Sequence, residues 1–70
     1  MSSASLPVIF GTNVREARLS KNMSQEVLAF KCGLDRTYIS GIERGIRNPS
    51  LLNVEKIAKA LKLSAASLVQ

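Results

Sequence analysis

The chain contains a single cysteine, Cys32, and no histidine. One cysteine cannot form an internal disulfide, and the remaining side chains offer no complete set of structural zinc ligands. Small domains often depend on one of these two devices, because a chain of 70 residues buries only about 60% of the surface that its unfolded form exposes. We therefore expect closely packed helices, self-association or a bound partner to supply the stability, with no metal and no cofactor.

The same composition argues against an enzyme. Asp35 is the only aspartate, and without histidine few side chains could act as general acid, general base or activated nucleophile. No catalytic group of residues is visible, and we expect no small-molecule ligand. Residues 1–10 lack the basic segment of a signal peptide, and nowhere do about 18 apolar residues run together. We therefore expect a cytoplasmic protein with no membrane partner.

The charge balance points to an anionic partner. Ten Lys and Arg residues oppose five Asp and Glu residues, which gives a formal net charge of +5. Nucleic acid is the commonest partner of so basic a chain.

The apolar pattern predicts an all-α fold. No run of Val, Ile or aromatic residues alternates at the period of a strand, and apolar residues recur three or four positions apart. We predict a single domain over residues 1–70, with residues 1–5 flexible and five helices after them. The four glycines, at positions 11, 33, 41 and 45, are interpreted as punctuation between helices.

The helix boundaries follow from capping residues. A first helix is expected to begin near Pro7 and to end at Lys21 and Asn22, since proline suits a first turn and asparagine tolerates a left-handed backbone. Ser24, Asp35, Ser50 and Ser64 are each suited to cap the start of a later helix, and Gly33 and Gly45 to follow the ends of the second and third. The residues expected on the inner sides of the first and fourth helices are Phe10, Val14, Ala17 and Leu19, and Leu51, Val54, Ile57, Ala58 and Leu61. In the second helix, Val27, Leu28, Phe30 and Cys32 are expected to flank an apolar strip.

Two short predicted helices, residues 25–32 and 36–44, have the size and spacing of a helix-turn-helix at about residues 24–45. Ala29 is small, as required where the second of these helices crosses the first. Gly33 can adopt the left-handed conformation of the turn, and Ile39 can fill the angle between the helices. Leu28, Cys32, Leu34 and Ile42 complete the apolar side, with Cys32 as a small core residue.

Residues 24–64, SQEVLAFKCGLDRTYISGIERGIRNPSLLNVEKIAKALKLS, resemble the Xre family, which comprises helix-turn-helix domains of the Cro and lambda-repressor type. Within that family, the segment LDRTYISGIERGIRNPS at 34–50 is most similar to the small controller proteins of restriction-modification systems. The resemblance implies a compact five-helix lambda-repressor-like domain. It also implies a sequence-specific transcriptional regulator that acts as a homodimer on a pseudo-palindromic operator in double-stranded DNA.

A helix packed through Ile39 and Ile42 is expected to turn its N-terminal side chains toward DNA. The predicted base contacts are Arg36, Thr37, Tyr38 and Ser40, and Gly41 is expected to face outward beside them. Arg36 can bind guanine through two hydrogen bonds, and Thr37 can meet a base edge or a thymine methyl. Tyr38 can stack on a base or bond to the backbone, with half-burial against a neighbouring helix as the alternative.

The predicted phosphate contacts are Gln25, Arg44, Arg47 and Asn48. Gln25 opens a helix whose backbone N–H groups can hold a phosphate, and the resemblance implies the same role. Two further charges, Arg18 and Glu43, fall near the inner faces of their helices, where each needs a partner. We predict that they form a structural ion pair, as the resemblance also implies, with two separate surface charges as the alternative.

The predicted dimer interface consists of Leu52, Leu63, Leu68 and Val69, with closure of the monomer core as the alternative for Leu68. Glu26 occupies a position where related phage repressors present an acid to RNA polymerase, so the resemblance suggests this enzyme as a further partner, with an ordinary acid at a helix N-terminus as the alternative. Lys56, Lys59 and Lys62 are expected to form a solvated face.

Two other functions stay open. One is a protein-interaction module, like an antitoxin, that touches DNA only together with a partner protein. The other is nucleic-acid binding without sequence preference, which would depend strongly on salt.

Overall fold

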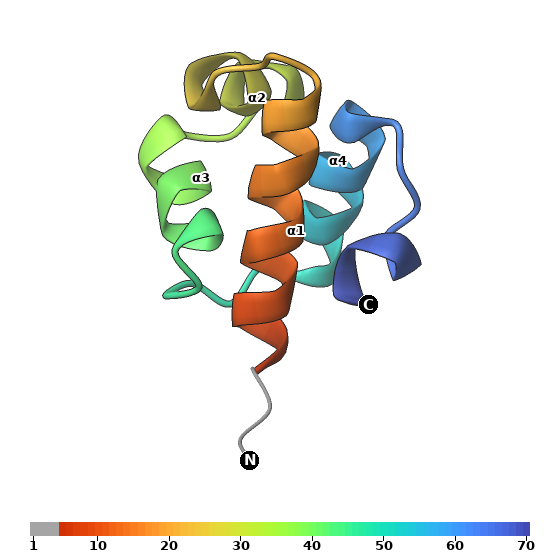
Figure 1. Ribbon diagram of the computed structural model, residues 1–70. Coiled ribbons are helices and arrows are strands. Elements are labelled where there is room, and N and C mark those ends of the chain that lie inside the picture. The colour runs from red at the N-terminus through yellow and green to blue at the C-terminus, as the bar shows by residue number, and fades with distance from the viewer. Residues whose placement is uncertain (1–4) are drawn as a thin grey trace.

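The computed structural model describes residues 5–70, and all of its regular structure is helical. The helices are α1 (Leu6–Ser20), α2 (Gln25–Cys32), α3 (Arg36–Glu43), α4 (Leu51–Leu61) and the 3₁₀ helix η1 (Ala66–Val69). In Figure 1, α1 runs down the middle of the view, with α3 on one side of it, α4 and η1 on the other, and α2 across the top. The predicted helical fold is confirmed for these residues. The flexibility predicted for residues 1–5 lies mostly outside them, and Ser5 is the extended residue that precedes α1.

The fifth element differs from the prediction, because it is a single 3₁₀ turn and not an α-helix. Its backbone bonds span three residues, from the Ser67 N–H to the Ser64 carbonyl (3.2 Å) and from the Leu68 N–H to the Ala65 carbonyl (3.1 Å). A segment of only four residues gains little from α-helical bonds, and short 3₁₀ pieces are common in such places. The domain therefore has four α-helices and one 3₁₀ turn.

The predicted caps are confirmed. The side chains of Ser24, Asp35 and Ser50 accept hydrogen bonds from the N–H groups of Val27 (3.0 Å), Thr37 (3.0 Å) and Asn53 (3.1 Å). Each bond satisfies a donor that the first helical turn leaves free, so these residues set where α2, α3 and α4 begin. The predicted C-terminal ends of α1, α2 and α3 also agree with the structure, because Asn22, Gly33 and Gly45 adopt positive φ values of 54°, 69° and 75°.

Two of the four glycines were interpreted wrongly. Gly33 and Gly45 do separate helices, but Gly11 and Gly41 lie inside α1 and α3, and both are buried. Their position in helices means that close packing, and not chain reversal, accounts for them. A reversal without glycine occurs after α4, where Lys62 itself has a φ of 58°.

One core joins all the elements. Its fully buried members are Val14 of α1, Leu28 of α2, Ile39 and Ile42 of α3, and Ile57 and Leu61 of α4. Leu68 of η1 also belongs to the core and is 2% exposed. The predicted inner faces are therefore largely correct. Four apolar residues do not fit: Leu19, Val27, Phe30 and Leu51 are exposed, the last two by 87% and 88%.

The exposures of Leu19, Phe30 and Leu51 have simple geometric causes. Arg18 takes the inward position in the last turn of α1, which turns the next residue, Leu19, to solvent. Leu51 is the first residue of α4, and Phe30 lies on the face of α2 that is opposite to its buried Leu28, Ala29 and Cys32. Among the described residues, no helix is long and apolar enough to cross a membrane.

Candidate nucleic-acid interface

The N-terminal turn of α3 presents the predicted base-contacting residues. Arg36 and Thr37 are exposed, and Ser40, one turn later, is half-buried. Ile39 and Ile42 of the same helix are fully buried, so the orientation of α3 is fixed by the core. The Asp35 carboxylate caps the N-terminus of α3 by accepting a hydrogen bond from the Thr37 N–H. The Arg36 and Thr37 side chains are exposed to solvent.

Tyr38 is partly packed, as its alternative interpretation anticipated. The ring is half-buried against the core, and its hydroxyl accepts a hydrogen bond from Asn53 Nδ2 of α4 (3.0 Å). The hydroxyl keeps its own hydrogen for a further acceptor. A base or phosphate contact by Tyr38 through that edge of the ring stays a prediction.

Arg47 covers part of α3, and this corrects the expectation for Gly41. The Arg47 guanidinium carbon lies 5.8 Å from the centre of the Tyr38 ring, a cation–π arrangement. The aliphatic part of Arg47 crosses Gly41 so closely that a Cβ there would lie 2.7 Å from Arg47 Cγ. Gly41 is thus buried beneath Arg47 and does not face outward beside the other candidate residues.

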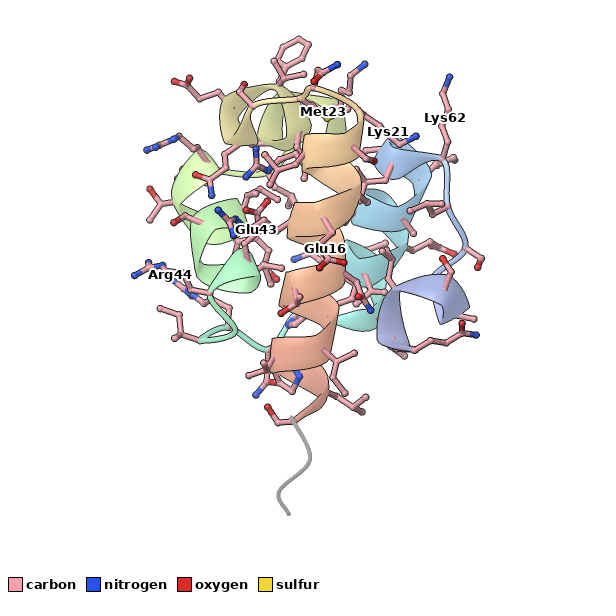
Figure 2. The ribbon with its side chains drawn as sticks, in the orientation of Figure 1. Glu16, Lys21, Met23, Glu43, Arg44 and Lys62 are labelled. Carbon is pink, nitrogen blue, oxygen red and sulfur yellow. The ribbon has the colours of Figure 1, made fainter. Side chains whose placement is uncertain are left out.

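Two more of the predicted phosphate contacts, Arg44 and Asn48, follow the C-terminal end of α3. Arg44 and Asn48 are exposed, and Arg44 Nε donates to the Ser40 carbonyl (3.4 Å). Figure 2 shows Arg44 projecting from the α3 side of the molecule and Lys62 from the opposite side. The arginines Arg36, Arg44 and Arg47 therefore belong to the α3 side. Lys56, Lys59 and Lys62 are exposed on the α4 side, as predicted.

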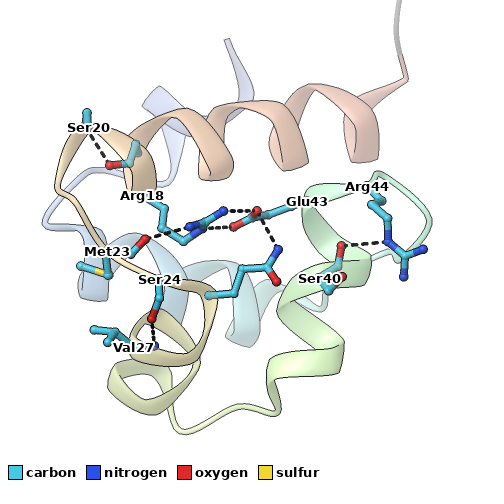
Figure 3. A network of polar contacts seen from close by, with 10 residues as sticks. Arg18, Ser20, Met23, Ser24, Val27, Ser40, Glu43 and Arg44 are labelled. Carbon is cyan, nitrogen blue, oxygen red and sulfur yellow. Dashed lines mark hydrogen bonds and ion pairs between the residues drawn. The ribbon is translucent and has the colours of Figure 1, made fainter.

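Arg18 and Glu43 form the predicted ion pair, the only one among residues 5–70 (Figure 3). Arg18 Nε and Nη2 donate to the two carboxylate oxygens at 2.6 and 2.9 Å, and Nη1 donates to the Met23 carbonyl at 2.8 Å. The hydrogen bonds to Glu43 raise the pKa of Arg18, and desolvation, which opposes them, is the smaller effect. The pair fixes α1 behind α3, so it sets the position of the candidate reading helix.

Gln25 is not a free side chain at the start of α2. Its Nε2 donates to Glu43 Oε1 at 3.1 Å, which connects the N-terminus of α2 to the buried ion pair. This link was not predicted, because residues 18 positions apart show no local pattern that would reveal it.

The predicted dimer residues separate into three groups. Leu52 and Leu63 are exposed and line the same hollow of about 560 Å³, together with Ala58 and Ala65. Val69 lines a different hollow with Leu6 and Phe10. Leu68 is 2% exposed and packs in the core, so it closes the monomer and offers almost no surface to a partner. Leu52 and Leu63 are the residues that the fold brings together on the surface.

Cys32 is a buried core residue, as predicted. Desolvation raises the pKa of its thiol, against a smaller opposing effect of Lys56. A raised pKa keeps the thiol protonated and therefore unreactive. Among residues 5–70, no three potential ligands from His, Cys, Asp and Glu lie close enough to hold a metal ion.

Comparison with known proteins decides the family. A family model described as helix-turn-helix matches residues 14–68, which include every helix-turn-helix residue discussed above. The chain belongs to this family. The control protein C.BamHI of Bacillus amyloliquefaciens is 62% identical to this chain over 63 residues. That alignment covers 89% of this chain and 78% of the relative.

Solved structures of helix-turn-helix proteins support the same assignment. The restriction-modification controller C.AhdI from Aeromonas hydrophila superimposes with a TM-score of 0.86 at 52% identity, over 89% of this chain and 94% of that one. The controller C.Esp1396I was solved as a tetramer in complex with its natural 35 base-pair operator. It matches with a TM-score of 0.84 at 42% identity, over 94% of this chain and 87% of that one.

Proposed function

We propose that this helix-turn-helix protein is a restriction-modification controller: a homodimeric, sequence-specific transcriptional regulator located in the cytoplasm. The observation that carries the proposal is the N-terminal turn of α3, where Arg36 and Thr37 are exposed while Ile39 and Ile42 are fully buried. A helix held in this way can enter the major groove with its first side chains at the base edges. The names of the similar control proteins support the same function.

Selection from random-sequence duplexes tests the proposal directly. The purified protein is mixed with the pool at about physiological salt, and the bound fraction is sequenced. A dimeric regulator should enrich a two-fold symmetric site with half-sites about one helical turn apart. A bound pool without enrichment would contradict sequence-specific reading and favour binding without sequence preference. No binding at all would favour the protein-interaction module, whose DNA binding needs a partner.

Arg36→Ala is expected to weaken operator binding by at least about 30-fold. Each arginine–guanine contact discriminates by about 1 kcal/mol or more, and a dimer loses two. Binding to a random duplex should weaken far less, because only a charge is lost there. Gel-shift titration on both duplexes measures this, with Lys62→Gln as the matched control, because Lys62 is exposed on the side opposite to Arg44 (Figure 2) and does not line the hollow of Leu52 and Leu63. Equal weakening on the two duplexes would show that Arg36 binds phosphate and does not read a base.

The homodimer is proposed to form through the surface of Leu52 and Leu63. Leu52 is 60% exposed, and the two side chains line one hollow that a second copy could cover and that is also lined by Glu55, Lys56 and Lys59. Glu26 is exposed on α2 and is available for the proposed contact with RNA polymerase.

Leu52→Glu is expected to raise the dissociation constant of the dimer at least about tenfold, because it places a charge in an apolar contact. The monomer fold should not change, since the side chain is exposed. Sedimentation equilibrium measures the dissociation constant, and circular dichroism checks the fold. Leu51→Glu is the matched control, because Leu51 is exposed on the same helix and does not line the hollow. A dimer weakened equally by both substitutions, or by neither, would contradict this interface.

A further inference from the structure

The carboxylate of Glu43 accepts more hydrogen bonds than an ion pair requires. Arg18 Nε binds one oxygen at 2.6 Å, and the other oxygen accepts both Arg18 Nη2 at 2.9 Å and Gln25 Nε2 at 3.1 Å. Glu43 itself is buried, and Gln25 is half-buried at the first position of α2. One buried carboxylate therefore holds residues from both α1 and α2.

The bond to Glu43 fixes which end of the Gln25 side chain faces inward. A carboxylate only accepts hydrogen bonds, so it selects the amide nitrogen of Gln25 and turns the amide oxygen away. The nitrogen carries two hydrogens, and only one of them is used by Glu43. The second hydrogen of Gln25 Nε2 is therefore held in place as a donor near the N-terminus of α2.

The start of α2 holds further donors beside this one. Ser24 satisfies the N–H groups of Val27, through its hydroxyl, and of Leu28, through its carbonyl. Within residues 5–70, the N–H groups of Gln25 and Glu26 donate to no protein acceptor, because they precede the first intrahelical bonds. These two N–H groups are available to a phosphate at the N-terminus of α2, where Gln25 is the first residue.

We infer that Glu43 is a positioning residue for DNA binding, because it orients the Gln25 amide as a preformed phosphate donor. This inference rests on the proposed function and adds the origin of the Gln25 contact. Without Glu43, the Gln25 side chain would rotate freely, and its oxygen would face and repel a phosphate in part of its conformations. With Glu43, the donor is in place before DNA arrives, so less conformational freedom is lost on binding.

A double-mutant cycle separates positioning from a purely structural role. Replacing both charges, in Arg18→Met/Glu43→Met, removes the acceptor of Gln25 without leaving an unpaired buried charge. The pair is compared with Gln25→Ala and with the triple variant Arg18→Met/Glu43→Met/Gln25→Ala. All measurements are made at a temperature where circular dichroism shows each protein folded. The binding constants are measured on a selected operator and on a random duplex, because every duplex presents phosphates.

We expect Gln25→Ala to weaken binding to both duplexes about tenfold for each subunit, the effect of losing one hydrogen bond to a charged group. The Met pair should weaken binding by a smaller factor, about fivefold for each subunit, when Gln25 is present, because the free amide must be immobilised on binding, and by less than about twofold when Gln25 is already alanine. A Met pair that weakens binding equally in both backgrounds would overturn the inference, since its effect would not pass through Gln25.

Relaxation of side-chain amides in the free protein supplies a second measurement that needs neither DNA nor a substituted core. The chain contains two glutamines, Gln25 and Gln70, so Gln70 at the C-terminus is an internal reference. The Gln25 side-chain amide should be much more rigid than that of Gln70. Equal mobility of the two amides would overturn the inference. Failure to bind any duplex would instead overturn the proposed function, while this measurement would still decide the orientation of Gln25.

Discussion

Arg18→Met is expected to lower the free energy of unfolding by about 3 to 5 kcal/mol, the usual cost of removing one partner of a buried ion pair. Glu43 would remain buried with Gln25 as its one remaining side-chain donor, and the Met23 carbonyl would lose the bond from Arg18 Nη1. Domains of this size have a total stability near the low end of about 5 to 15 kcal/mol. The variant should therefore be largely unfolded at 37 °C, as measured by circular dichroism during urea and thermal denaturation.

The double variant Arg18→Met/Glu43→Met is the control for this prediction. It removes both charges and fills the site with apolar side chains of similar length, so no buried carboxylate remains unpaired. We expect it to lose less than half of the stability that Arg18→Met loses. A single variant within about 1 kcal/mol of the natural protein would show that the pair does not fix α1 behind α3.

The contribution of Arg18 to the pH dependence of folding stability follows from the direction in which its pKa is shifted. The pKa of Arg18 is raised in the folded state by its hydrogen bonds to Glu43. A basic group with a raised pKa stabilises the fold fully at every pH below its pKa in the unfolded chain, and loses that contribution only as pH rises through the higher folded value. Titration of Arg18 should therefore leave stability unchanged between about pH 6 and pH 9.

Helix boundaries were predictable because their causes are local. The bonds from Val27, Thr37 and Asn53 to their caps span two or three residues, so Ser24, Asp35 and Ser50 reveal them in the sequence. The ion pair of Arg18 and Glu43 was predictable for another reason. A charge on the inner face of a helix needs a partner, and Arg18 and Glu43 both fall near the inner faces of their helices.

Contacts between distant segments were not predictable from periodicity. Leu51 and Phe30 fit an apolar strip, but whether a strip is covered depends on which elements lie beside it, and none covers these two side chains. Arg47 over Tyr38 and Gly41, and Gln25 on Glu43, join side chains whose proximity results from the packed fold. The residues expected to contact DNA were placed on one side of the molecule, but their individual contacts remain predictions.

Gly11 is the clearest case of a residue explained only by the packed structure, and Gly11→Ala is expected to destabilise the protein by about 3 kcal/mol. A glycine inside a helix costs about 1 kcal/mol relative to alanine, so a substitution without other effects would stabilise α1. A Cβ on Gly11 would collide with the Ile42 carbonyl oxygen and lie 3.1 Å from the Glu43 carbonyl oxygen. Both atoms are backbone of α3, so the two helices must move apart, at a cost typical of an overpacked core.

Gly41→Ala is the matched substitution, because Gly41 also lies inside a helix and is also buried. There the new Cβ would meet Arg47 Cγ at 2.7 Å, and a flexible surface side chain can move aside where a backbone carbonyl cannot. We expect the gain in helix propensity to offset that movement, so Gly41→Ala should stay within about 1 kcal/mol of the natural protein. Chemical denaturation of the two variants side by side measures the contrast. If Gly11→Ala were as stable as Gly41→Ala, α1 and α3 would not be in the close contact that holds the candidate reading helix in position.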